Sequence, residues 1–214
     1  MSYNQREFIT GKYYHVFNKT ADNKTPFLDN TKCSMFLLTS YYYRASDLKT
    51  SFSKWKQFNN SQKNKIKEQL QNSNNFRVDI ISYCLMPNHF HFILKQISNQ
   101  GIHDFISNIT NSFTRAYNIE NNRLGALFLH RFHDVPIISS EQLLTVSRYV
   151  HRNPIAHKTN FSESFRSYPW SSYKDYLEIS HDPLNLTNTK PILSYFNNSK
   201  SYQKFVEDDF IHDE

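Results

Sequence analysis

Glycine and cysteine are scarce in this sequence of 214 residues. The three glycines, Gly11, Gly101 and Gly125, are too far apart to form a glycine-rich phosphate loop, and neither GxGxxG nor GxxxxGK[ST] occurs. Chemistry driven by ATP hydrolysis or by a dinucleotide is therefore not expected. The two cysteines, Cys33 and Cys84, lack CxxC spacing and are too few for a disulfide framework, so we expect buried thiols.

Long apolar segments are also missing. No hydrophobic run reaches transmembrane length, and the polar residues 1–11 lack a signal-peptide core, so we expect a soluble, cytoplasmic protein without a membrane partner. Aromatic residues, in contrast, are abundant: 18 Phe and 14 Tyr supply enough apolar surface for one substantial core. Lysine plus arginine exceeds aspartate plus glutamate by six, which permits nucleic-acid binding without proving it.

The apolar periodicity predicts an α+β fold. Four strands and three main helices are expected, with strands at 12–18, 76–86, 89–94 and 127–138, and helices at 31–45, 101–120 and from 139 to the residue before Pro154. Shorter helices are predicted at 171–177 and 202–209. This order matches a ferredoxin-like (split βαβ) antiparallel sheet sandwich with an added C-terminal helix. That architecture hosts many functions, so the residues must decide the function.

Two histidines are the first candidates for chemistry. On a strand, alternate residues face opposite sides, so His89 and His91 share one face while Phe90 and Phe92 point into a core. A rigid strand that presents two imidazoles is suited to metal binding. An isolated HxH is more often a pair of solvated side chains, so further signals are needed.

Tyr149 and Asn153 provide those signals. They are four residues apart at the end of a predicted helix and therefore lie on one helix face. The amide oxygen of Asn153 can complete a metal site built from two histidines, and the phenol one turn earlier can point at whatever the metal holds. Each residue also has an ordinary explanation, Tyr149 as a tyrosine closing the edge of a core and Asn153 as a helix-ending residue.

Several segments resemble the HUH single-tyrosine transposases, in the IS200-like branch associated with repetitive extragenic palindromes (REP). The segment YCLMPNHFH at 83–91 is similar to the MPNHxH motif of that family. Four further segments fit in the same order, namely YHVFNK at 14–19, RF at 131–132, RYVHRNP at 148–154 and YPWSSY at 168–173. The resemblance covers roughly residues 12–177. It implies a catalytic domain over 1–178, with a Lys/Asn-rich insertion at about 46–75, and a C-terminal extension over 179–214.

The resemblance also implies the chemistry. His89, His91 and Asn153 would be metal ligands and Tyr149 the nucleophile in metal-dependent nicking and joining of single-stranded DNA. The intermediate would be a covalent 5′-phosphotyrosine, and hairpins in repeats would be the substrates. Because that linkage keeps the bond energy, rejoining needs no ATP. Imidazole ligands also suit zinc, but phosphoryl chemistry and the family favour Mg²⁺ or Mn²⁺.

Three basic residues, Lys19, Arg131 and Arg152, are candidates for contacts with the DNA backbone, with ordinary solvated charge as the alternative reading. The group that activates Tyr149, and the choice between monomer and homodimer, are left open by the sequence. The insertion at 46–75 is expected to be either a charged pair of surface helices or a mobile segment.

Two other classes of function compete with this reading. One is a non-catalytic nucleic-acid binding protein on the same fold, such as a domesticated transposase relative, in which aromatics including Tyr13 and Phe17 stack on bases. Such a module needs neither the histidine pair nor Tyr149. The other is a zinc hydrolase or deaminase, but the sequence contains no HExxH, and His89-Phe90-His91 is not the HxE of zinc deaminases.

Overall fold

The computed structural model describes residues 7–46, 48–156, 165–179 and 184–208. Within these ranges the strands are β1 (Tyr13–Lys19), β2 (Val78–Met86), β3 (His89–Gln96) and β4 (His133–Ile137). The helices are α1 (Asn30–Tyr43), α2 (Phe52–Gln57), α3 (Asn60–Gln71), α4 (Gly101–Glu120), α5 (Ser140–Ala156), α6 (Tyr173–Tyr176), α7 (Lys190–Leu193) and α8 (Ser199–Glu207). Short 3-10 turns lie at Ala21–Asn23, Pro26–Leu28, Ser73–Asn75 and Phe165–Ser167.

The four strands form one sheet in the order β2-β3-β1-β4, and each neighbouring pair is antiparallel. Strand β1 therefore lies between β3 and β4, although β2 and β3 come between β1 and β4 in the sequence. This is the strand order of a ferredoxin-like sandwich, and the predicted α+β fold class is confirmed.

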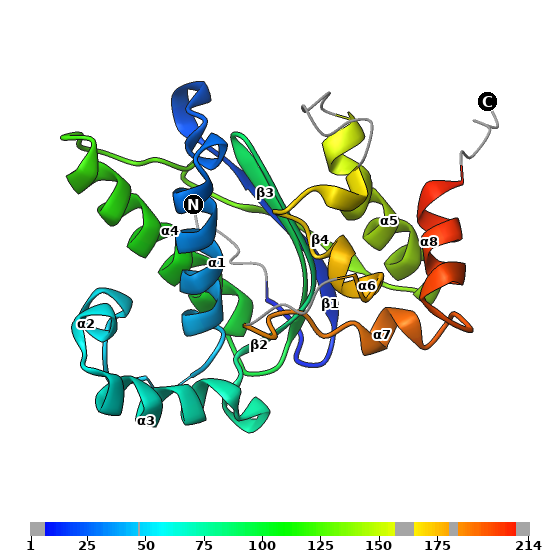
Figure 1. The fold of residues 1–214 in the computed structure, drawn as a ribbon, viewed down its shortest axis with the longest axis horizontal. Helices are drawn as coiled ribbons and strands as arrows, with labels where there is room; N and C mark the ends of the chain where they lie inside the picture. Colours follow the sequence, from blue (N-terminus) through cyan, green and yellow to red (C-terminus); the bar gives the residue numbers. More distant parts are fainter. Residues whose placement is uncertain (1–6, 47, 157–164, 180–183, 209–214) are drawn as a thin grey trace.

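The helices divide between the two faces of the sheet (Figure 1). Helices α1 and α4 pack against each other and cover one face, while α5 lies on the other, followed by α6, α7 and α8. Alternation along each strand sends side chains to the two sides in turn. The tyrosine-bearing helix α5 is thus separated by the sheet from the helices α1 and α4.

The face under α1 and α4 holds a phenylalanine core. Phe36 of α1 lies 5.1 Å from Phe90 and 5.2 Å from Phe113 between ring centroids, and all three side chains are buried. The side chain of Asp29 caps α1 by accepting a hydrogen bond from the Thr31 amide. The contact between Phe36 and Phe90 holds strand β3, which carries the two histidines, against α1.

Helix α4 begins at one of the three glycines. A Cβ atom added to Gly101 would come within 2.1 Å of the Arg77 carbonyl oxygen, so no larger residue fits this close approach. From there α4 runs over 101–120, as predicted. Gly101 thus stands where the start of α4 closely approaches the backbone just before β2.

The structure corrects the predicted boundaries of β4 and α5. Strand β4 occupies only His133–Ile137 of the expected 127–138, because the chain first makes an isolated bridge between Phe128 and Thr20 and bends before entering the sheet. Helix α5 continues through Pro154 instead of ending before it. Proline lacks an amide hydrogen and disfavours helix interiors, but within the last turn only one intrahelical hydrogen bond is lost. Residues 157–158, expected to form the exit from this helix, lie outside the described residues.

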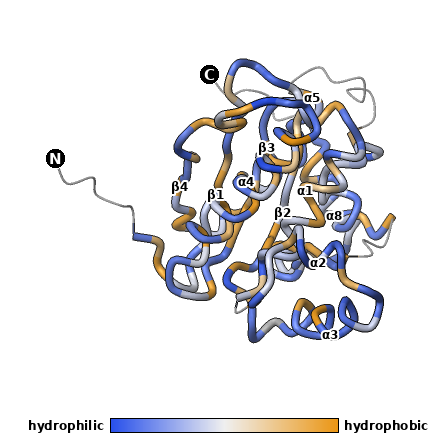
Figure 2. The backbone as a smooth tube through the Cα atoms, turned by 90° about the vertical axis from the view of Figure 1, so that its left-hand side faces the viewer, coloured by the Kyte–Doolittle hydropathy of each residue, from blue (hydrophilic) through white to orange (hydrophobic). Residues whose placement is uncertain are grey.

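The segment predicted as an insertion contains the helices α2 and α3, in agreement with the predicted pair of surface helices. Asn59 and Gln62 form a capping box at the start of α3, and the side chains of Trp55 and Leu70 are buried. Both helices lie at the end of the molecule away from α5, and α3 is predominantly hydrophilic (Figure 2).

The described part of the C-terminal segment packs on the rest of the chain. The Asn188 amide donates a hydrogen bond to the Ile80 carbonyl of β2, and Leu186 and Tyr202 are buried in the cores on opposite sides of the sheet. Helix α8 begins at Ser199, before the predicted start at 202, and ends at Glu207; the predicted end at 209 lies outside the described residues. Within the described ranges, no helix is both long and apolar enough to span a bilayer.

Candidate active site

Strand pairing gathers aromatic and imidazole rings on the face of the sheet below α5. Phe17 of β1 stands opposite His91 of β3 in the register, and Lys19 stands opposite His89. Residues of like parity share a face, so His15 joins His89 and His91 on this side. The ring centroids of His89 and His91 lie 5.0 Å apart, and those of His15 and His91 lie 5.2 Å apart.

Helix α5 places Tyr149 over these rings. The tyrosine ring makes edge-to-face contacts with His91, at 5.6 Å between centroids, and with His15, at 5.7 Å. On the buried side of the helix, the neighbouring Val150 packs in the core beneath α5, whereas the Tyr149 residue is 49% exposed. The phenol is therefore held against the histidine face and is still accessible to a large substrate.

Asn153 lies one turn beyond Tyr149 and is almost completely buried. Its Nδ2 donates a hydrogen bond to the Tyr149 carbonyl at 3.0 Å, while its buried Oδ1 has no hydrogen-bond partner. A buried amide oxygen without a partner is costly unless something else binds it. This oxygen is therefore suited to accept a cation or the donor group of a ligand.

The ring orientation of His89 also fits a metal ligand. Its Nδ1 lies 2.8 Å from Oδ1 of Asn88, which can only accept a hydrogen bond, so Nδ1 carries the proton. The lone pair of a neutral His89 is then on Nε2, the arrangement found when the other ring nitrogen of a metal ligand is anchored.

The predicted donor set consists of two imidazoles and one amide oxygen. Among the described residues, no group of three or more His, Cys, Asp or Glu side chains is arranged to hold a metal ion. The predicted site therefore depends on Asn153 as the third protein ligand. Neutral ligands of this kind fit a divalent cation whose charge remains available to a phosphate.

His15 is a part of the site that the sequence reasoning did not single out as a functional residue. Its Nε2 lies 3.0 Å from Nδ1 of His91, and both side chains are buried. Burial lowers the pKa of His15 to about 4, so its ring is neutral near pH 7. The available signal was the alternation of His15 and Phe17 on a predicted strand, but pairing with the strand of His91 is not visible in the sequence.

The three basic candidates are placed differently. Lys19 is exposed at the end of β1 beside His89, and Arg131 is exposed in the loop that precedes β4. Arg152 is half-buried, and its Nη1 donates to the carbonyl oxygens of Val206, at 3.2 Å, and Asp208, at 3.1 Å. The contacts of Arg152 favour a role in holding α8 against α5.

His151, two residues after Tyr149, anchors helix α5 on its buried side. His151 is fully buried, with Nδ1 2.8 Å from the Tyr202 hydroxyl and Nε2 2.9 Å from Oγ of Ser172. Burial lowers the pKa of His151 to about 3, so the ring stays neutral. The hydroxyl of Ser172 in turn accepts from the Tyr83 amide at 2.9 Å, which ties α5 to β2.

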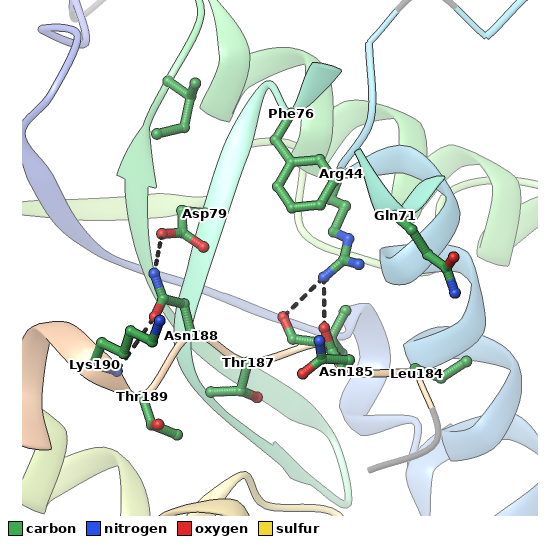
Figure 3. Close-up of a pocket in the computed structure, with 12 residues that line it drawn as sticks. Arg44, Gln71, Phe76, Asp79, Leu184, Asn185, Thr187, Asn188, Thr189 and Lys190 are labelled. Carbon is green, nitrogen blue, oxygen red and sulfur yellow. Dashed lines mark hydrogen bonds between the residues drawn. The ribbon is translucent and has the colours of Figure 1, made fainter. Parts of the chain in front are cut away.

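A separate pocket of about 640 Å³ lies at the opposite end of β2, between α1, α3 and residues 184–190 (Figure 3). Arg44 donates from Nη1 to the Asn185 carbonyl at 2.8 Å, and Asn188 donates to the Asp79 carboxylate at 2.7 Å. Burial raises the pKa of Asp79. These bonds fasten the C-terminal segment across the sheet edge, and none of the predicted site residues lines this pocket.

A family of known proteins matches part of this chain. Residues 50–153, just under half of the chain, match the sequence model of the family described as "Transposase IS200 like". The matched segment contains β2, β3 and α5 as far as Asn153, and it begins after β1. The predicted resemblance to IS200-like transposases is confirmed.

A solved structure shares the fold. It is described as "Structure of the REP associates tyrosine transposase bound to a REP hairpin", with a TM-score of 0.55 and 16% sequence identity over 88% of this chain and 92% of that chain. At this identity the likeness concerns the fold. No curated protein matches this chain.

Proposed function

Because residues 50–153 match IS200-like transposases, we propose that this protein nicks and joins single-stranded DNA with Tyr149 as nucleophile. One observation carries the proposal: the half-exposed ring of Tyr149 packs against His91 and His15, one turn before the partnerless amide oxygen of Asn153. A tyrosine that only closed a core edge would need neither of these neighbours.

The reaction is a transesterification at phosphorus. The Tyr149 oxygen forms a bond to phosphorus as the bond from phosphorus to the 3′ oxygen breaks, and the phenolic proton is lost while the 3′ oxygen gains one. The products are a 5′-phosphotyrosine and a free 3′-hydroxyl. Attack by a 3′-hydroxyl on the phosphotyrosine reverses these steps, so joining consumes no nucleotide.

His89, His91 and Asn153 are the proposed ligands of Mg²⁺ or Mn²⁺. A bound divalent cation would polarise a phosphodiester oxygen and offset negative charge that develops at phosphorus. The residues themselves orient the site: the hydrogen bond to Asn88 fixes the ring of His89, and Asn153 is fastened to the backbone of the tyrosine helix.

Lys19 and Arg131 are the proposed contacts with the DNA backbone, since both are exposed at the end of the sheet where His89 lies. A single strand is the proposed substrate because it bends around a fixed nucleophile at much lower cost than duplex DNA. A hairpin with an unpaired flank presents such a strand beside a rigid stem, and exposed aromatic rings can stack on its bases.

The test compares three labelled DNA substrates at one salt concentration: a hairpin with an unpaired flank, an unstructured single strand and a blunt duplex. Each is incubated with the full chain in Mn²⁺ or in EDTA, and the covalent adduct is counted on a denaturing gel. We expect an Mn²⁺-dependent adduct that forms fastest on the hairpin. Equal or faster reaction of the duplex would exclude the single-strand mechanism.

The same assay separates catalysis from the non-catalytic alternative. A domesticated relative would bind the hairpin in a gel-shift experiment and form no adduct under any metal condition. Binding without covalent attachment would therefore assign the protein to that second class.

A further inference from the structure

The sheet brings together two histidines that are 76 residues apart in the sequence. Nε2 of His15 lies 3.0 Å from Nδ1 of His91, and the two rings are stacked with 17° between their planes. The contact follows from the register, because His91 stands opposite Phe17, two residues beyond His15 on the same face of β1. Both side chains are buried, so water does not substitute readily for either partner.

This hydrogen bond links the tautomer of His91 to the tautomer of His15. Two neutral imidazoles can bond in this way only if one nitrogen donates and the other accepts. When Nδ1 of His91 is the donor, its lone pair is on Nε2, as in His89, where the side-chain Oδ1 of Asn88 imposes the same tautomer. His89 and His91 then both present Nε2 to one shared ligand.

We propose that His15 is a positioning residue that accepts the Nδ1 proton of His91 and so keeps its Nε2 available to a divalent cation. The inference rests on the proposed metal site and adds to it a residue from β1. Partners of this kind, which bind the second nitrogen of a ligating histidine, fix its tautomer and the orientation of its ring.

A purely structural role is less consistent with the surroundings of His15. Its remaining ring contacts are aromatic, with Phe17 at 5.1 Å and the edge of Tyr149 at 5.7 Å between centroids. A phenylalanine would satisfy those contacts without the cost of burying two polar nitrogens. The hydrogen bond to His91 is the contact that a phenylalanine could not make.

Two substitutions of His15 separate the roles. His15→Gln places an amide oxygen near the position of Nε2 and keeps an acceptor for His91. His15→Phe keeps a ring of similar size and removes the acceptor. Circular dichroism and thermal melting of the full chain establish that each variant is folded.

The first measurement is calorimetric titration with Mn²⁺ alone. We expect His15→Phe to weaken Mn²⁺ binding about 10- to 100-fold and His15→Gln to stay close to wild type. Equal affinity in wild type and His15→Phe would overturn the positioning role while leaving the metal site intact. If the wild type itself bound no Mn²⁺, both the proposed site and the role of His15 would be rejected.

The second measurement needs neither metal nor DNA. Long-range ¹H–¹⁵N NMR spectra distinguish the two tautomers of imidazole, and comparison with His91→Gln assigns the His91 signals. We expect the Nδ1-protonated form in the wild type and in His15→Gln, and a shift toward the Nε2-protonated form in His15→Phe. Finding His91 protonated on Nε2 in the wild type would contradict the proposal even if His15→Phe failed to fold.

Discussion

On strand β3, the residues that face α1 and α4 are Phe90, Phe92 and Leu94, whereas those that face α5 begin with His89 and His91. The first group is fully buried in a phenylalanine core, and every member can be exchanged for another apolar residue at the cost of packing alone. The two histidines of the second group are polar rings whose orientation depends on named hydrogen bonds, to Asn88 and His15. On β3, the side chains that face α1 and α4 thus stabilise the fold, and those that face α5 include the proposed metal ligands.

The same contrast applies to the tyrosines. Tyr176 and Tyr202 are fully buried, and burial raises the pKa of each phenol well above its ordinary value. Neither can reach a DNA backbone in the folded protein. Tyr149, on the face of α5 that lies over the histidines, is the proposed nucleophile because it is both accessible and next to His91, a proposed metal ligand.

The largest expected effect is on covalent attachment. Tyr149→Phe removes one hydroxyl and keeps the ring that packs on His91, so we expect complete loss of the DNA adduct with little change in thermal stability. Tyr195→Phe is the matched control, since Tyr195 is 56% exposed but lies outside the histidine face. An adduct of Tyr149→Phe formed at the wild-type rate would reject this nucleophile.

A substitution on the opposite face of the sheet should lower stability and leave metal binding unchanged. Phe113 is buried against Phe27 and Phe36, with ring centroids 5.4 Å and 5.2 Å away. Phe113→Ala leaves a cavity and should lower the free energy of unfolding by about 3–5 kcal/mol. Urea denaturation measures this loss, and the Mn²⁺ affinity of the folded fraction should not change. A changed affinity would show that the two faces are coupled.

The donor set should respond unequally to truncation. We expect His89→Ala and His91→Ala each to lower Mn²⁺ affinity by at least about 10-fold, and Asn153→Ala to have a smaller effect because water can replace an amide oxygen. Calorimetry on the single variants and on the double histidine variant gives these values. Unchanged Mn²⁺ binding in the double variant would remove the metal site from this face.

The buried histidine below α5 predicts a pH dependence of stability. The pKa of His151 is about 3 in the folded protein and near the ordinary value of about 6.5 when unfolded. Its contribution is therefore fully present above about pH 6.5 and falls by about 1.4 kcal/mol per pH unit below it, because only the unfolded chain takes up the proton. The buried His15 acts in the same direction.

Urea denaturation at about pH 7 and about pH 5 measures this slope. His151→Gln should reduce it, whereas His130→Gln, at an exposed position, should leave it unchanged. A slope that is the same in His151→Gln and wild type would show that another group dominates the acid sensitivity.

The smallest expected effect distinguishes two basic residues. Lys19→Gln should weaken hairpin binding and reduce the slope of log affinity against log salt by about 0.7, the value for one contact with a single strand. Arg152→Gln should instead lower thermal stability, because its guanidinium holds the end of α8, and should keep the salt slope. Fluorescence anisotropy over a salt series makes the comparison, and a reversed result would exchange the two roles.

Elements with a strong local pattern were predictable. The alternation of His89 to Leu94 and the helical spacing over 101–120 determine which side of each element is apolar, and both elements formed as expected. The start of β4 was not predictable, because Leu127 and Phe128 look like strand residues but are buried in the core just outside the paired strand. The helix end predicted before Pro154 was wrong, because the sequence does not show that Pro154 lies in the last helical turn.

The sequence by itself determined the strand that carries two histidines on one side, the spacing of Tyr149 and Asn153 on one helix face, and the resemblance to a transposase family. These are consequences of short-range periodicity, which is written in neighbouring residues. Only the tertiary structure decided that β1 pairs with β3, so that His15 meets His91, and that α5 packs with Tyr149 over both rings. Those contacts depend on the register between distant strands and on the packing of a helix across the sheet, and no local pattern specifies either.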